Sequence, residues 1–200
     1  MQNTKGNIYC VIGKSASGKD SLFKAILHKQ PIPLKTIITY TTRPIRSHEQ
    51  NGVEYFFVST EQFCKMREQG LVIEYRCYNT VFGDWYYFTA DDGQISESDN
   101  YLLIMTLEGY SSLCKYFGND RIISIYINVE DGLRLERALA RERQQEKPAY
   151  AEMCRRFLSD TVDFSEENLK KLHITNCFEN DEFDSCLEKI CNYIISKSNA

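Results

Sequence analysis

The fold is decided by one stretch, which reads Ile8-Tyr9-Cys10-Val11-Ile12-Gly13-Lys14-Ser15-Ala16-Ser17-Gly18-Lys19-Asp20. Its first five residues form a short apolar run, which is typical of a strand buried on both faces. The next seven match the pattern G-x-x-x-x-G-K, and an amphipathic helical pattern follows over 19–29. This order predicts a phosphate-binding loop, because successive backbone N–H groups and the N-terminus of the helix face the same anion.

The loop residues are expected to contact a polyphosphate, and the Lys19 side chain is expected to reach its β- and γ-phosphates. The predicted contacts are Gly13, Ser15, Ala16, Ser17, Gly18, Lys19, Asp20 and Ser21. Position 20 departs from the usual pattern, which has Ser or Thr there as a Mg²⁺ ligand. A carboxylate is also a good ligand for Mg²⁺. Asp20 therefore either binds the metal itself or leaves that contact to Ser21 or water.

Beyond the loop, short apolar runs alternate with longer helical patterns, which predicts a doubly wound α/β fold with a parallel sheet. We expect core strands at 7–12, 35–38, 101–106, 121–127 and 172–175, and helices at 19–29, 108–117, 131–144, 150–171 and 182–196. Alternating strand patterns at 54–58, 71–77 and 85–89, with a helix at 60–69, indicate a small α+β insertion. We interpret the chain as one domain, residues 1–200, with a core at 1–38 and 94–200, an insertion at about 39–93 and a lid at about 141–155.

The composition of the chain argues against several other classes of protein. The chain has 24 Lys and Arg against 28 Asp and Glu, a net charge of −4, so its bulk charge attracts neither nucleic acid nor an anionic membrane. No apolar run reaches the length of about 18 residues that a membrane span needs. The eight cysteines show no C-x-x-C pair and no zinc-ligand spacing. We expect a cytoplasmic protein, a monomer or weak homodimer, with reduced thiols packed in its core and small molecules as partners.

A second polar segment reads Thr39-Tyr40-Thr41-Thr42-Arg43-Pro44-Ile45-Arg46, followed by Asn51-Gly52-Val53-Glu54-Tyr55-Phe56-Phe57-Val58-Ser59. Two arginines three residues apart beside hydroxyl groups form a fork that suits a phosphate dianion. A solvated pair of surface arginines is the alternative.

Together with the phosphate loop, these segments resemble the guanylate kinase family, whose signature reads T-T-R-x-x-R and then G-x-x-Y-x-F-V-S. The segment Gly70-Leu71-Val72-Ile73-Glu74-Tyr75 is similar to the one that ends in the family's guanine-binding glutamate, and Glu179-Asn180-Asp181 is similar to its late Asn-Asp turn. The resemblance implies that Arg43, Arg46 and Tyr55 hold the phosphate of GMP, with Thr39 nearby. It also implies that Glu74 accepts hydrogen bonds from guanine N1–H and the exocyclic amine.

The family's Y-Y-G-T motif has two possible matches, Tyr86-Tyr87-Phe88-Thr89 and Val81-Phe82-Gly83-Asp84. We prefer the first, since it restores a tyrosine hydroxyl and the threonine, and it adds Tyr87 and Thr89 to the acceptor site.

The place of the family's lid holds a cluster of arginines, Arg134, Arg137, Arg141, Arg143, Arg155 and Arg156. Arg137, Arg141 and Arg155 match best, and the resemblance implies that they act with Lys19 to stabilise the transferring phosphoryl group. A solvated helix face paired with Glu136 and Glu142 is the alternative for any one of them.

One departure concerns the family's I-L-D-I-D run, where this chain has Ile104 and Thr106 in place of the two aspartates. Asp20 and Glu108 are candidates to compensate. Otherwise the substrate has changed or activity is lost.

Three functions are therefore compared. The first is a kinase that moves the γ-phosphate of MgATP to GMP. The second is a kinase of the same fold with another acceptor, because the G-K-D loop also resembles ribose 1,5-bisphosphate kinases. The third is a non-catalytic binding module, which the intact Gly13, Gly18 and Lys19 disfavour.

Overall fold

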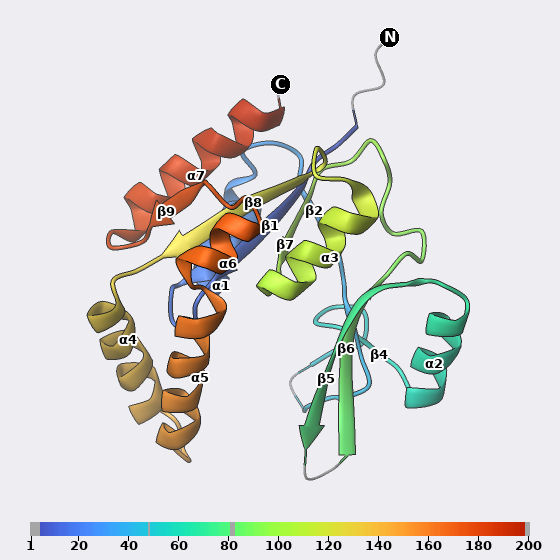
Figure 1. Cartoon of the computed structure of the whole chain (residues 1–200), viewed down its shortest axis with the longest axis horizontal. Helices are drawn as coiled ribbons and strands as arrows, with labels where there is room; N and C mark the ends of the chain where they lie inside the picture. Colours follow the sequence, from blue (N-terminus) through green and yellow to red (C-terminus); the bar gives the residue numbers. More distant parts are fainter. Residues whose placement is uncertain (1–4, 48, 81–82, 199–200) are drawn as a thin grey trace.

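The computed structural model describes residues 5–47, 49–80 and 83–198. Its central feature is a parallel sheet of five strands in the order β2-β7-β1-β8-β9 (Figure 1). The strands are β1 (Ile8–Gly13), β2 (Lys35–Thr36), β7 (Tyr101–Ile104), β8 (Ile122–Asn128) and β9 (Cys177–Glu179). This sheet confirms the predicted doubly wound α/β fold.

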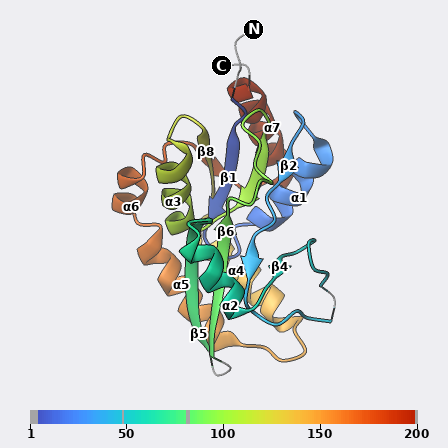
Figure 2. The same cartoon turned by 90° about the vertical axis from the view of Figure 1, so that its right-hand side faces the viewer.

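Strand β1 is central and buried on both faces, which explains its uninterrupted apolar sequence. Ile8, Cys10 and Ile12 face one core cluster, and Tyr9 and Val11 face another. Helices α3 (Leu107–Phe117) and α6 (Glu166–Lys171) lie on one side of the sheet, and α1 (Lys19–Lys29) and α7 (Phe183–Ser198) on the other (Figure 2).

A second sheet has the order β4-β3-β6-β5. Its strands are β3 (Tyr40–Thr41), β4 (Phe56–Phe57), β5 (Val72–Thr80) and β6 (Gly83–Ala90), and helix α2 (Thr60–Glu68) covers one face. Phe63 of α2 is 1% exposed and packs on Tyr75, Tyr86 and Phe88. Because side chains alternate along a strand, the residues between them, Glu74, Arg76, Tyr87 and Thr89, occupy the opposite face.

Two expected elements are wrong. No strand forms at 172–175: Leu172 ends α6, His173 has a left-handed φ of 53°, and the last core strand is β9. The apolar residues of this segment do indicate burial, because Ile174 packs in the core, but Ile174 follows a turn and does not belong to a strand. The expected helix at 150–171 is two helices, α5 (Tyr150–Asp163) and α6, because the Ser165 side chain accepts a hydrogen bond from Asn168 N–H and starts a new helix.

The expectation that the cysteines pack in the core holds for Cys10, Cys186 and Cys191 and is wrong for three exposed residues, Cys77, Cys154 and Cys177. All eight are free thiols. None of the helices in the described part of the chain has the length and apolar character that a membrane span requires.

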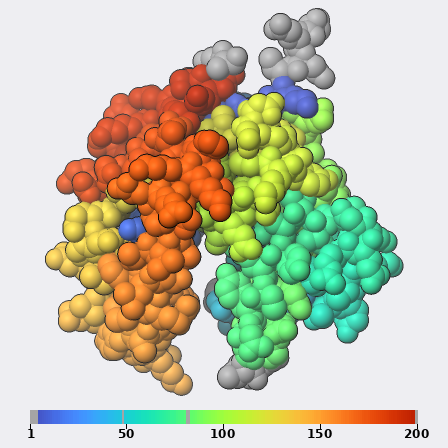
Figure 3. Space-filling view, in the orientation of Figure 1, coloured from blue at the N-terminus to red at the C-terminus, as the bar shows by residue number. Residues whose placement is uncertain are grey.

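Helices α4 (Asp131–Arg143) and α5 extend beyond the parallel sheet on one side, and the β5–β6 hairpin with α2 extends on the other (Figure 1). The space-filling view shows an open cleft between α5 and the hairpin (Figure 3). The loop after β1 and the start of α3 lie at the carboxyl ends of the parallel strands, which is where α/β sheets bind ligands.

Candidate active site

The loop that joins β1 to α1 is shaped by two close approaches. A Cβ atom on Gly13 would lie 2.6 Å from the carbonyl oxygen of Ile127. Gly18 has a φ of 83°, and a Cβ atom there would collide with the side-chain amide of Asn180. That amide donates a 2.8 Å hydrogen bond to the carbonyl of Ser17. The Asn180 turn therefore fixes the loop, and both glycines are required by its geometry.

The start of α1 is open to an anion. Its N-cap is Gly18, so no side chain satisfies the first N–H groups of the helix. Lys19 Nζ lies 3.7 Å from a carboxylate oxygen of Asp20, and the Asp20 side chain is 74% exposed. Ser21 is also exposed. The cation and the carboxylate predicted for the donor site therefore lie side by side at the N-terminus of α1.

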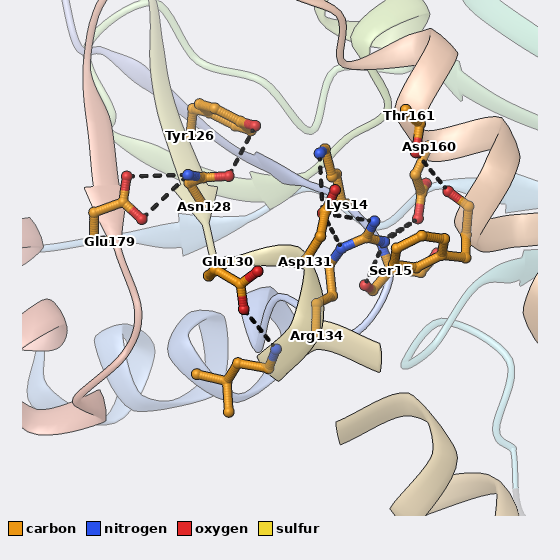
Figure 4. Close-up of polar contacts among 12 residues, drawn as sticks. Lys14, Ser15, Tyr126, Asn128, Glu130, Asp131, Arg134, Asp160, Thr161 and Glu179 are labelled. Carbon is orange, nitrogen blue, oxygen red and sulfur yellow. Dashed lines mark hydrogen bonds and ion pairs between the residues drawn. The ribbon is translucent and has the colours of Figure 1, made fainter. Parts of the chain in front are cut away.

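Helices α4 and α5 are tied to the phosphate loop by an ionic network (Figure 4). Asp160 Oδ2 of α5 accepts hydrogen bonds from Ser15 N–H at 2.7 Å and from Arg134 Nη1 at 3.1 Å. Arg134 is 1% exposed, also pairs with Asp131, and lies over the Phe157 ring at 4.0 Å from its centroid. A carboxylate therefore occupies one backbone N–H of the phosphate-binding loop.

Replacing Asp160 with Asn is expected to lower the free energy of unfolding by about 1–3 kcal/mol, because buried Arg134 loses one of its two anionic partners. The same change is expected to tighten ATP binding, since it removes a negative charge beside the phosphate loop. Chemical denaturation and ATP titration measure the two effects. Asp163→Asn is the control, because Asp163 lies nearly one turn later on α5 and its side chain accepts a hydrogen bond from Ser159 rather than from the loop. Equal stability of the two variants would contradict the role of Asp160.

The lid arginines have different environments. Arg137 donates to the carbonyl of Asn180 at 2.9 Å. Arg141 and Arg156 line a cavity of about 260 Å³ between α4 and α5, together with Ser15 of the loop. Arg155 is exposed and pairs with Glu152. Arg156, rather than the predicted Arg155, therefore shares a cavity with the phosphate loop.

The predicted phosphate fork is preorganised around Arg43. This side chain is 4% exposed and donates two hydrogen bonds to Glu49, at 2.7 and 2.9 Å, and one to the Tyr87 hydroxyl, at 3.0 Å. The guanidinium lowers the pKa of Glu49 to about 2. The Tyr55 ring lies 5.7 Å from that of Tyr87. Arg46 is exposed, and its backbone N–H also donates to Glu49. The structure thus brings together Arg43, Arg46, Tyr55 and Tyr87.

Glu74 lies on the same face of the second sheet as Tyr87. It is 6% exposed, and its Oε1 accepts a 2.8 Å hydrogen bond from the Thr89 hydroxyl. Burial raises the pKa of the Glu74 carboxyl, and the charge of Arg76 and the Thr89 hydrogen bond oppose this rise. The preferred alignment, with Tyr87 and Thr89, therefore places both groups at the predicted site. Val81 and Phe82 of the other alignment lie outside the described residues. Thr39 lies directly before β3 and is half-buried.

The residues that replace the family's two aspartates have structural roles. Ile104 is partly buried and packs against a core cluster, and the Thr106 side chain caps α3 by accepting from Gly109 N–H. Helix α3 also carries Glu108, whose charge raises the pKa of Glu74. Among the described residues, no group of three His, Cys, Asp or Glu side chains forms a metal cluster.

Sequence reasoning did not identify Asp160, Glu49 or Arg76. The sequence could have indicated Glu49 as an ion-pair partner, because this carboxylate follows Arg43 by six residues and Arg46 by three. It could also have indicated Arg76, since residues two apart on a strand share a face. Nothing in the sequence indicates Asp160, because its contact with Ser15 spans 145 residues.

A phosphate loop on a parallel sheet, facing a second sheet with arginines, tyrosines and a buried glutamate, defines the class of P-loop kinases that act on nucleoside monophosphates. The guanylate kinase family model matches residues 5–197. The chain therefore belongs to the guanylate kinase family.

Individual relatives agree with this assignment. The chain is 32% identical to the guanylate kinase of Thermotoga maritima over 143 residues, which cover 71% of this chain and 67% of the relative. It is 28% identical to the guanylate kinase of Haemophilus influenzae over 198 residues, which cover 97% and 89%. The crystal structure of guanylate kinase from Anaplasma phagocytophilum matches with a TM-score of 0.66 at 18% identity, over 97% of this chain and 87% of that one. This last match supports the fold.

Proposed function

We propose that this chain transfers the γ-phosphate of MgATP to GMP and releases ADP and GDP. One observation carries the proposal: a buried carboxylate, Glu74, and a buried guanidinium, Arg43, contact Thr89 and Tyr87, which lie two residues apart on β6 and share one face of the sheet. A carboxylate suits the N1–H and amine donors of guanine, and a guanidinium suits a phosphate.

The donor is held by the phosphate loop, residues 13–21. Backbone N–H groups and Lys19 bind the β- and γ-phosphates. Asp20 fits a Mg²⁺ site, because it offers an exposed carboxylate beside the loop, and Mg²⁺ in nucleotide sites takes one or two carboxylates together with phosphate oxygens and water. Bound Mg²⁺ would neutralise charge on the β- and γ-phosphates.

The acceptor is held by the second sheet. Arg43, Arg46, Tyr55 and Tyr87 bind the GMP phosphate, and Glu74 and Thr89 bind guanine, with Thr39 nearby. Region 39–93 serves as the acceptor-binding unit. The lid, at about 141–155, comprises the end of α4, the segment that follows it and the start of α5. Lys19, Arg137, Arg141 and Arg155 offset the charge of the transferring group. Closure of the cleft excludes water and aligns the two phosphates for direct transfer without a covalent intermediate.

A coupled assay with MgATP and a panel of acceptors tests the proposal. GMP is expected to give the highest kcat/KM, with AMP and UMP far lower. Ribose 1,5-bisphosphate belongs in the same panel. Turnover of that sugar without turnover of GMP would reject the proposed acceptor while keeping the kinase.

Asp20 gives a separate prediction about the metal. Asp20→Ser is expected to retain activity, because a hydroxyl at this position is also a Mg²⁺ ligand. Asp20→Ala is expected to need more Mg²⁺ for half-maximal activity, since it offers no side-chain ligand. Mg²⁺ titrations at fixed ATP measure the difference. The same Mg²⁺ dependence in all three proteins would show that residue 20 has no metal role.

A further inference from the structure

The acceptor face carries a second charged residue beside the predicted guanine-binding glutamate. Arg76 lies two residues after Glu74 on β5, so both side chains point to the same face of the sheet. Arg76 Nε lies 3.4 Å from Glu74 Oε2, and the two side chains are 20% and 3% exposed. This is a largely buried ion pair inside the proposed acceptor site.

The pair is close but not hydrogen-bonded. Arg76 Nε and Glu74 Oε2 are both buried, and neither has a hydrogen-bond partner among the described residues. Buried polar atoms without partners are costly and uncommon in folded proteins. Glu74 Oε1 is satisfied by Thr89, so the two unpartnered atoms are the adjacent ones. A ligand that presents a donor to Glu74 Oε2 and an acceptor to Arg76 Nε would satisfy both atoms.

Arg76 also lies between the two ends of the proposed acceptor site. It is directly opposite Tyr87 in the β5–β6 register, whereas Glu74 is opposite Thr89. Burial raises the pKa of both Glu74 and Tyr55, and the charge of Arg76 opposes the rise in each, so the guanidinium acts on both ends of the site. The guanidinium is thus placed beside the carboxylate on the side toward the phosphate fork.

We propose that Arg76 is a specificity-determining residue that donates a hydrogen bond to O6 of guanine while Glu74 accepts from N1–H and the N2 amine. The inference rests on the proposed function, because it assumes a guanine acceptor. One edge of guanine presents two donors followed by an acceptor, and a carboxylate next to a guanidinium is the complement of that edge. In the same orientation adenine presents an acceptor, N1, to Glu74 and a donor, the N6 amine, to Arg76, so it satisfies neither side chain.

The first experiment uses the unmodified protein and 6-thioguanosine monophosphate, which keeps N1–H and the amine but has sulfur, a weak acceptor, in place of O6. The kcat/KM for GMP is expected to exceed that for the thio analogue by about 10-fold or more. Equal use of the two acceptors would overturn the inference without any substitution.

The second experiment replaces Arg76 with Met, which is similar in length and uncharged. The kcat/KM for GMP is expected to fall by about 10- to 100-fold, mainly through KM, and the preference for GMP over the thio analogue is expected to disappear. The ratio of GMP to inosine monophosphate, which lacks only the amine, reports on Glu74 and is expected to remain. Arg76→Lys is expected to restore part of the lost preference.

Arg67→Met is the matched control. Arg67 belongs to α2 and lies over the rings of Phe63 and Tyr75 on the opposite face of the second sheet. The control is expected to keep the thio preference of the unmodified protein. If Arg76→Met uses GMP as well as before, or better, then Arg76 does not bind guanine or competes with it for Glu74, and the inference is overturned. Failure of the unmodified protein to phosphorylate GMP would instead reject the proposed function.

Discussion

Lys19→Ala is expected to lower kcat/KM for phosphoryl transfer from MgATP to GMP by about 10²- to 10³-fold or more. The loop offers backbone N–H groups to the phosphates, but Lys19 is the cation that follows its second glycine and is proposed to reach the β- and γ-phosphates. Charge on these oxygens is greatest during transfer, so the loss is expected in kcat as well as in ATP affinity. A coupled assay at several ATP concentrations separates the two.

The fold is expected to survive this change. The charged contact of Lys19 is a 3.7 Å pair with the exposed Asp20, and such surface pairs contribute about 0–1 kcal/mol. Denaturation midpoints of the variant and the unmodified protein should therefore agree closely. Lys24→Ala, an exposed lysine further along α1, is the control and is expected to keep full activity. An active Lys19→Ala variant would contradict the assignment of the phosphate loop.

The parts predicted well from the sequence are those with local signals. The apolar run of β1, the loop from Gly13 to Lys19 and the amphipathic α1 follow one another directly, so their spacing alone predicts their arrangement. Alternating strand patterns also predicted β4, β5 and β6 of the second sheet, but they did not predict the two-residue strand β3. Strand patterns did not predict the functional face of this sheet, because Glu74 and Thr89 are 15 residues apart and meet through the pairing of β5 with β6. The family resemblance assigned both residues to the acceptor site but did not predict their hydrogen bond.

The errors come from contacts between distant segments. Apolar residues at 172–175 indicate burial, but they do not distinguish a turn packed on the core from a strand, and pairing with β8 selects 177–179 instead. The division of 150–171 into two helices is the exception, because it comes from a local contact, the hydrogen bond between the Ser165 side chain and Asn168 N–H. The contact of Asp160 with the phosphate loop depends on how α5 packs beside the loop, which no spacing within α5 indicates.

Glu74→Gln is expected to reduce kcat/KM for GMP by about 10²-fold while AMP changes little. In the proposed complex the carboxylate accepts from two guanine donors, whereas a glutamine side chain would place an amide donor against one of them. Because this site is buried, neither of the mismatched groups can form a hydrogen bond to water instead. The preference for GMP over AMP, measured side by side in one coupled assay, should therefore nearly vanish.

The pH dependence of that preference supplies a second test. Burial raises the pKa of Glu74, and so does the charge of Glu108 on α3, whereas Arg76 on the same strand and the Thr89 hydrogen bond from β6 lower it. The net shift is upward from 4.5. Since guanine binding needs the ionised carboxylate, the preference for GMP should fall as the pH decreases through this raised pKa, at a higher pH than for an ordinary glutamate.

The Glu74→Gln variant has no carboxyl group to titrate and should show a flat ratio of GMP to AMP over the same range. Arg46→Ala provides the contrast, because it removes a proposed phosphate contact that every nucleoside monophosphate would share, and it should weaken GMP and AMP alike at each pH. A selective loss of GMP in Arg46→Ala, or an unchanged preference in Glu74→Gln, would mean that base recognition lies elsewhere. In that case a sugar phosphate becomes the better candidate acceptor for this kinase fold.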